Sequence, residues 1–92
     1  MSITVRVPAV LRRLTGGRDE LEAEGTTVAE VFDRVGSEYG GFREKVLTDS
    51  GELRPFLNVF VNGEDVRFAS DLRTSVKEGD EVSIVPSVAG GR

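Results

Sequence analysis

The sequence predicts an α+β fold, in which a mixed sheet of about five strands has one main helix lying across one face. Two observations support this prediction. Apolar and polar residues alternate with the period of a half-buried strand near both ends of the chain, and an amphipathic helical pattern lies between them. A chain of 92 residues is one small domain. We place this domain at residues 1–86 and expect a flexible Gly-Gly tail at residues 87–92.

The first third of the chain predicts a β-hairpin. Residues 3–7 alternate as a strand does, and Pro8 ends this strand because proline has no backbone N–H. Residues 15–19 are typical of a tight connection, and residues 20–23 predict the returning strand, which Gly25 ends.

The middle of the chain predicts the main helix. Thr27 and Glu30 have the spacing of a capping box, in which each side chain accepts a backbone N–H of the other residue. The helix should end at Gly40-Gly41, with glycine in a left-handed C-terminal cap. Residues 42–47 follow as a short helical or extended piece. One face of the helix is apolar at Val28, Val31, Phe32, Val35 and Tyr39.

The last third predicts three more strands. Residues 53–61 read as the longest strand, and Asn62-Gly63 favours a type I′ hairpin turn into a brief strand at residues 65–67. Residues 72–79 are irregular, and residues 81–86 form the final strand. The side chains expected to face the helix are Ile3, Val5, Val7, Leu57, Val59, Val61, Val82 and Ile84. Those expected to face outward include Phe56, Phe60 and Val85.

The composition excludes several classes of function. The chain has no cysteine and no histidine, so it lacks thiolate nucleophiles, imidazole bases, disulfides and the usual zinc or iron ligands. No nucleophile motif or phosphate loop is present. We therefore expect neither an enzyme nor a metal site. A net charge of −4 argues against nucleic-acid binding. Without a signal-peptide pattern or a long apolar stretch, we expect a cytoplasmic protein with no membrane contact.

Two groups of residues are candidates for docking a partner. Phe60 and Val85 should lie on neighbouring strands of the uncovered sheet face, where an apolar patch often marks an interface. Alternatively, a loop covers one of them, or the register differs by one residue. Arg12 and Arg13 could pair with carboxylates of a partner, although a compositional bias toward arginine is the explanation that we favour.

The Gly90-Gly91 pair follows the final strand, with only Arg92 after it. Glycine has no Cβ, so the pair would fit a narrow partner cleft. The five residues 87–91 reach roughly 17 Å when extended. An ordinary frayed end is the alternative reading.

The segments 61–67, 79–86 and 88–91 resemble the ThiS/MoaD family of ubiquitin-like sulfur carriers, and most closely the carriers of cysteine synthesis. The resemblance covers essentially the whole domain and implies the β-grasp fold. It also implies that an E1-like partner uses ATP to adenylate the Gly91 carboxylate. A sulfur donor then displaces AMP and leaves a thiocarboxylate, so the carrier itself binds no cofactor.

The resemblance assigns roles to further residues. Val88, Ala89 and Gly90 would pass into the partner active site, while Phe60, Val85 and Pro86 would dock on the partner. A cysteine-synthase-like enzyme is the expected sulfur acceptor, with molybdopterin, thiazole or thiosugar synthesis as other destinations. A ubiquitin-like protein modifier or a plain binding module is the alternative function.

Arg92 departs from the family pattern, because its peptide bond leaves Gly91 without a free carboxylate. Three explanations stay open. A protease removes Arg92, which makes Gly91 and Arg92 a processing site and is the explanation that we favour. Otherwise Arg92 is a remnant of recombinant expression, or the chain is a relative that carries no sulfur.

Overall fold

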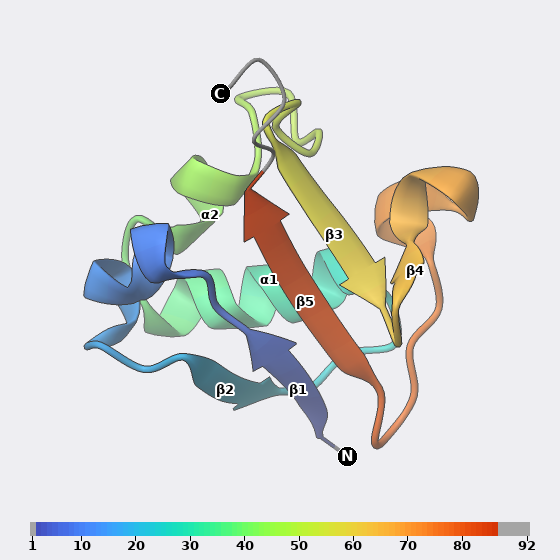
Figure 1. Ribbon diagram of the computed structural model, residues 1–92, viewed down its shortest axis with the longest axis horizontal. Helices are drawn as coiled ribbons and strands as arrows, with labels where there is room; N and C mark the ends of the chain where they lie inside the picture. The colour runs from blue at the N-terminus through green and yellow to red at the C-terminus, as the bar shows by residue number, and fades with distance from the viewer. Residues whose placement is uncertain (1, 87–92) are drawn as a thin grey trace.

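The β-strands form one mixed sheet, and helix α1 lies across one of its faces (Figure 1). The computed structural model describes residues 2–86. The sheet has the order β2-β1-β5-β3-β4, in which β1 and β5 are parallel and the other neighbours are antiparallel. This is the predicted β-grasp arrangement. Its strands are β1 (Ile3–Arg6), β2 (Glu20–Ala23), β3 (Leu57–Val61), β4 (Glu64–Asp65) and β5 (Glu81–Pro86).

Five helical segments connect these strands. Two are α-helices, α1 (Val28–Glu38) and α2 (Phe42–Val46). The other three are 3₁₀ helices, η1 (Ala9–Thr15), η2 (Val66–Phe68) and η3 (Asp71–Arg73). The sequence pattern indicated α1 and the helical form of α2, but not the 3₁₀ helices.

The core lies between α1 and the sheet. All the side chains predicted to face the helix are buried except Val61, which is half-buried and packs against the core. The apolar face of α1 is buried as expected, apart from the half-buried Tyr39. Phe32 of α1 meets Phe42 of α2 edge to face, with ring centroids 6.0 Å apart. This contact joins the two α-helices.

The capping box forms in a modified way. The backbone N–H of Glu30 donates to Thr27 Oγ1 at 3.2 Å, as predicted. The Glu30 carboxylate, however, accepts the backbone N–H and the hydroxyl of Thr26, both at 2.8 Å, instead of the N–H of Thr27. These hydrogen bonds hold the pKa of Glu30 below its ordinary value.

The prediction for the end of α1 was wrong in detail. Tyr39, with extended backbone, is the C-terminal cap, and its N–H donates to the carbonyl of Val35. Gly41 does adopt a left-handed conformation, with φ of +88°, but it begins α2. Its positive φ is what turns the chain sharply from one helix into the next.

Strand β3 is shorter than predicted, and β5 is the longest strand. Leu53 pairs instead with Leu47 in an isolated bridge, and the N–H of Leu57 donates to the carbonyl of Arg54 in a turn. Pro55 lies within this turn, where its missing N–H costs no sheet hydrogen bond. The strand therefore begins only after Phe56.

The hairpin after β3 has the predicted turn. Asn62 and Gly63 both have positive φ, +52° and +89°, as a type I′ turn requires. The returning strand β4 ends at Asp65, earlier than predicted, because the Asp65 carboxylate accepts the N–H of Arg67 and begins η2. Helix η3 occupies the start of the segment that was expected to be irregular.

Candidate functional site

The candidate site surrounds Pro86, the last residue of β5 and of the described chain. Strand β5 pairs with β1 on one side and with β3 on the other, so it lies in the middle of the sheet (Figure 1). The register places Pro86 opposite Leu57, at the start of β3. The end of β5, from which residues 87–92 continue, is therefore fixed by its pairing with β3, whereas the pairing with β1 ends at Ser83.

Hydrogen bonds of Asp80 and Asn62 fix the start of β5. Asp80 is 7% exposed, and its carboxylate accepts the Nδ2–H of Asn62 at 3.0 Å and the backbone N–H of Lys77 at 2.9 Å. The side-chain oxygen Oδ1 of Asn62 in turn accepts the backbone N–H of Glu81 at 2.9 Å. The hydrogen bond from Asn62 contributes most to holding the pKa of Asp80 below its ordinary value. Asn62 thus serves both the hairpin turn and the start of β5.

The predicted sheet-face residues face outward as expected. Val85 is 43% exposed and lies opposite Asn58, while Phe60 is half-buried and lies opposite Ser83. Phe60 and Val85 are thus diagonal neighbours, which places their Cα atoms roughly 7–8 Å apart. The polar Asn58 and Ser83 occupy the other diagonal. At this spacing an aromatic side chain can still reach its diagonal neighbour, so Phe60 and Val85 form one small apolar site on this sheet face.

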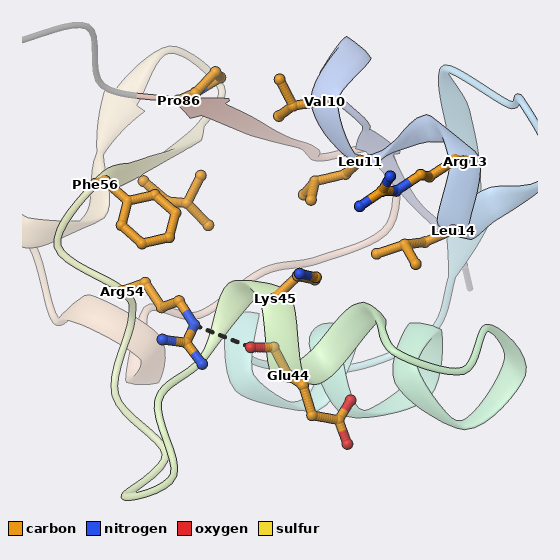
Figure 2. A pocket seen from close by; sticks show the side chains of 10 residues that line it. Val10, Leu11, Arg13, Leu14, Glu44, Lys45, Arg54, Phe56 and Pro86 are labelled. Atoms are coloured by element: carbon orange, nitrogen blue, oxygen red, sulfur yellow. Dashed lines mark hydrogen bonds between the residues drawn. The ribbon is translucent and has the colours of Figure 1, made fainter. Parts of the chain in front are cut away.

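A groove of about 640 Å³ lies beside Pro86 (Figure 2). We call it the tail-base groove. It is enclosed by η1, α2 and the turn before β3, three segments that are far apart in the sequence. Its apolar lining consists of Val10, Leu11, Leu14, Phe56, Leu57 and Pro86. Two of these side chains are unusually open to solvent, since Val10 is 62% and Phe56 is 56% exposed.

The charged lining of the tail-base groove is mainly positive. Arg13, Lys45 and Arg54 contribute to it, together with Glu44. Figure 2 shows that the Glu44 carboxylate points away from the apolar side chains. The backbone carbonyl of Glu44 accepts the Nε–H of Arg54 at 3.0 Å and so holds this guanidinium at the rim. A chain with an overall charge of −4 therefore places three cationic side chains in the lining of the groove that also includes Pro86.

The two arginines considered for docking have different positions. Arg12 donates its Nε–H to the backbone carbonyl of Val7 at 3.1 Å, which holds η1 against the end of β1. Arg13 lines the tail-base groove. Sequence reasoning identified Arg13 as a candidate and Phe56 as outward-facing, but it did not join them, because no sequence pattern connects η1 with the turn before β3.

The remaining predicted site residues lie outside the described residues. These are Val88, Ala89, Gly90, Gly91 and Arg92. Within residues 2–86, no group of three or more acidic side chains could hold a metal ion. No helix in the same part of the chain is long and apolar enough to cross a membrane.

Known proteins match the chain over almost its whole length. The ThiS family model matches residues 5–91. Sulfur carrier protein CysO of Mycobacterium tuberculosis is 42% identical over 99% of this chain and its own full length. Small archaeal modifier protein 3 of Haloferax volcanii is 32% identical, also over 99% of this chain and its own full length. In the crystal structure of the Amycolatopsis orientalis BexX/CysO complex, a chain 45% identical to this one superposes with a TM-score of 0.90, covering 97% of this chain and 99% of that one.

These matches agree with the fold, and the Gly-Gly motif lies within the residues that the family model matches. The chain therefore belongs to the ThiS family of ubiquitin-like β-grasp proteins.

Proposed function

We propose that this protein is a sulfur carrier in which Gly91 holds the sulfur as a terminal thiocarboxylate. The observation that carries the proposal is the Gly90-Gly91 pair, which follows the central strand of a β-grasp domain after only Ser87, Val88 and Ala89. The relative named as a sulfur carrier supports it. In this proposal residues 1–86 are the docking body, and residues 87–92 form the tail.

The chemistry balances without a catalytic group on the carrier. The Gly91 carboxylate attacks the α-phosphorus of ATP in the active site of an E1-like partner, forming an acyl-adenylate and releasing pyrophosphate. A sulfide-level donor then attacks the acyl carbon, AMP leaves, and one carboxylate oxygen has been replaced by sulfur. The lack of histidine and cysteine in the carrier is consistent with this scheme, because the partner enzyme supplies the acid–base groups.

The tail and the domain have separate roles in the proposal. Val88, Ala89 and Gly90 pass into the partner active site, where a residue without a Cβ avoids crowding the reacting carbonyl. Phe60, Val85 and Pro86 contact the partner surface. We propose that the acceptor is a cysteine-synthase-like enzyme in the cytoplasm, with molybdopterin, thiazole and thiosugar synthesis as the other sulfur destinations.

Gly91 can react only after the bond to Arg92 has been hydrolysed. We propose that a protease removes Arg92. Intact mass spectrometry of the protein isolated from its source organism tests this step, and the expected C-terminus is Gly91. A natural protein that retained Arg92 would contradict both the processing step and the carrier function.

The direct test incubates the chain ending at Gly91 with ATP, an E1-like enzyme from the source organism and a sulfide donor. The expected result is a mass increase equal to the replacement of one oxygen by sulfur. The matched control is the chain that retains Arg92, which should remain unchanged. An adenylate-forming enzyme that releases pyrophosphate with this carrier but never yields the sulfur product would contradict the proposal.

A second candidate function is covalent protein modification, which is favoured by the similarity to small archaeal modifier protein 3. The same activated Gly91 would then form an amide with a target lysine. A ladder of larger conjugates that disappears on deletion of Gly90 and Gly91 would support modification, whereas the thiocarboxylate alone would support the carrier function.

A further inference from the structure

The tail-base groove combines an open apolar lining with a positive rim. Two of the most exposed large apolar side chains of the described residues, Val10 and Phe56, both line it. Exposed apolar side chains that converge in a concavity usually mark a site of protein contact. The volume of about 640 Å³ is large enough for a bulky apolar side chain and its neighbours.

The rim determines which surface the groove can accept. Arg13 projects toward the groove from η1 and Lys45 from α2, while Arg54 lies at the opposite end (Figure 2). Within residues 2–86, neither Arg13 nor Lys45 takes part in an ion pair. The carboxylate of Glu44 points away, so the lining attracts negative charge. An uncharged apolar side chain alone would leave these cations without an oppositely charged partner. Carboxylates beside it would pair with them.

We propose that the tail-base groove is a second docking surface, which binds a large apolar side chain of a partner protein with Asp or Glu within two residues of it. Pro86 lines the groove and is followed directly by the tail. A protein that takes the tail into its active site must therefore cover this region. This surface differs from the sheet face around Phe60 and Val85, and it rests on the proposed function only in the identity of the partner.

The floor of the groove is held in place by its own packing. Leu14 of η1 lies against Gly41, where an added Cβ would be 3.4 Å from Leu14 Cδ2. Leu11 and Leu57 are buried beneath the opening. Arg54 is held by the carbonyl of Glu44, and its own carbonyl accepts Nη2 of Arg67 at 3.2 Å. A preformed site of this kind loses little conformational entropy when it binds a partner.

Site-specific photocrosslinking tests the proposal with the full chain. Phe56→benzoylphenylalanine places the probe at the groove, and Phe68→benzoylphenylalanine is the matched control, because Phe68 is 86% exposed in η2 and does not line the groove. Each protein is irradiated in an extract of the source organism, and the joined peptides are sequenced by mass spectrometry. The expected adduct is specific to position 56 and joins a partner segment with the proposed composition.

Charge exchange then tests the rim. The double change Arg13→Glu and Lys45→Glu should reduce the adduct yield about tenfold, since two weak ion pairs become repulsions. Replacing the partner carboxylates by lysine should restore the yield. Both carrier positions are exposed, and circular dichroism checks that the fold is unchanged.

Several results would overturn the proposal. These are an adduct at position 68 as strong as that at 56, a partner peptide without carboxylates, no adduct at position 56, and an adduct to residues 87–92 or to a second copy of the chain. The outcome is independent of the sulfur chemistry. Thiocarboxylate formation without a specific adduct at position 56 refutes the groove alone, and a specific, charge-dependent adduct without thiocarboxylate refutes the carrier function alone.

Discussion

Replacing Asp80 by asparagine should destabilise the domain far more than a surface charge change does. In the wild type, Asp80 Oδ1 accepts Asn62 Nδ2–H and Oδ2 accepts the N–H of Lys77. The side chain of the Asp80→Asn variant can accept only one of these hydrogen bonds, because its amide nitrogen then faces a second donor. One hydrogen bond to a charged group contributes about 1.5–3 kcal/mol, so we expect a loss of about 2 kcal/mol in the free energy of unfolding.

The loss should depend on pH in a definite direction. The folded pKa of Asp80 is lowered, so its contribution to stability is fully present above its ordinary pKa of 3.8 and is lost as the pH falls through the folded pKa. The stability difference between wild type and variant should therefore be largest near about pH 7 and shrink below about pH 4.

Urea unfolding followed by circular dichroism measures this difference in the free energy of unfolding. In a thermal melt at neutral pH, the melting temperature of the variant should be lower by about 8–16 °C. Asp33→Asn is the matched control, because Asp33 pairs with Arg43 at 3.0 Å on an exposed surface and should contribute about 1 kcal/mol or less. Equal effects at the two positions, or a difference that does not change with pH, would refute the role assigned to Asp80.

Three further changes test the fold by the same urea measurement. Thr27→Ala removes the acceptor of the Glu30 N–H and should cost about 1 kcal/mol, so an unchanged midpoint would contradict the capping role. Phe32→Ala empties a fully buried position and should cost about 3–5 kcal/mol, and a loss below about 1 kcal/mol would contradict its place in the core. Gly63→Ala puts a side chain at φ of +89° and should lower the free energy of unfolding by about 1–2 kcal/mol. The control is Gly40→Ala, where φ is not in the left-handed region and no loss is expected. Equal losses at the two positions would contradict the turn assignment.

The strands whose pattern is local were predictable from the sequence. Strands β2 and β5 begin and end where predicted, and the turn at Asn62 follows from the residues that tolerate positive φ. Helix η1 was missed because a 3₁₀ turn has no long apolar period. The late start of β3 follows from the turn around Pro55 and from the bridge between Leu47 and Leu53, neither of which alternation reveals.

The candidate site could be predicted only in part, for the same physical reason. Its Gly90-Gly91 motif is contiguous and is visible in the sequence, as is the outward direction of Phe60 and Val85. The tail-base groove is formed from side chains of residues 10, 11, 13, 14, 44, 45, 54, 56, 57 and 86. Three long-range contacts bring them together: the packing of η1 against α2, the hydrogen bond from the Arg54 N–H to the Val46 carbonyl, and the pairing of β3 with β5.

The position of β5 has a consequence for synthesis of the protein in the cell. The strand made last lies between β1 and β3, so these two strands have no partner on their inner edges until residues 81–86 have left the ribosome. Such unpaired edges and long-range pairings slow folding and favour aggregation. The domain can therefore complete its folding only after residues 81–86 have emerged, and a chain that ends before them would expose both strand edges to chaperones and proteases.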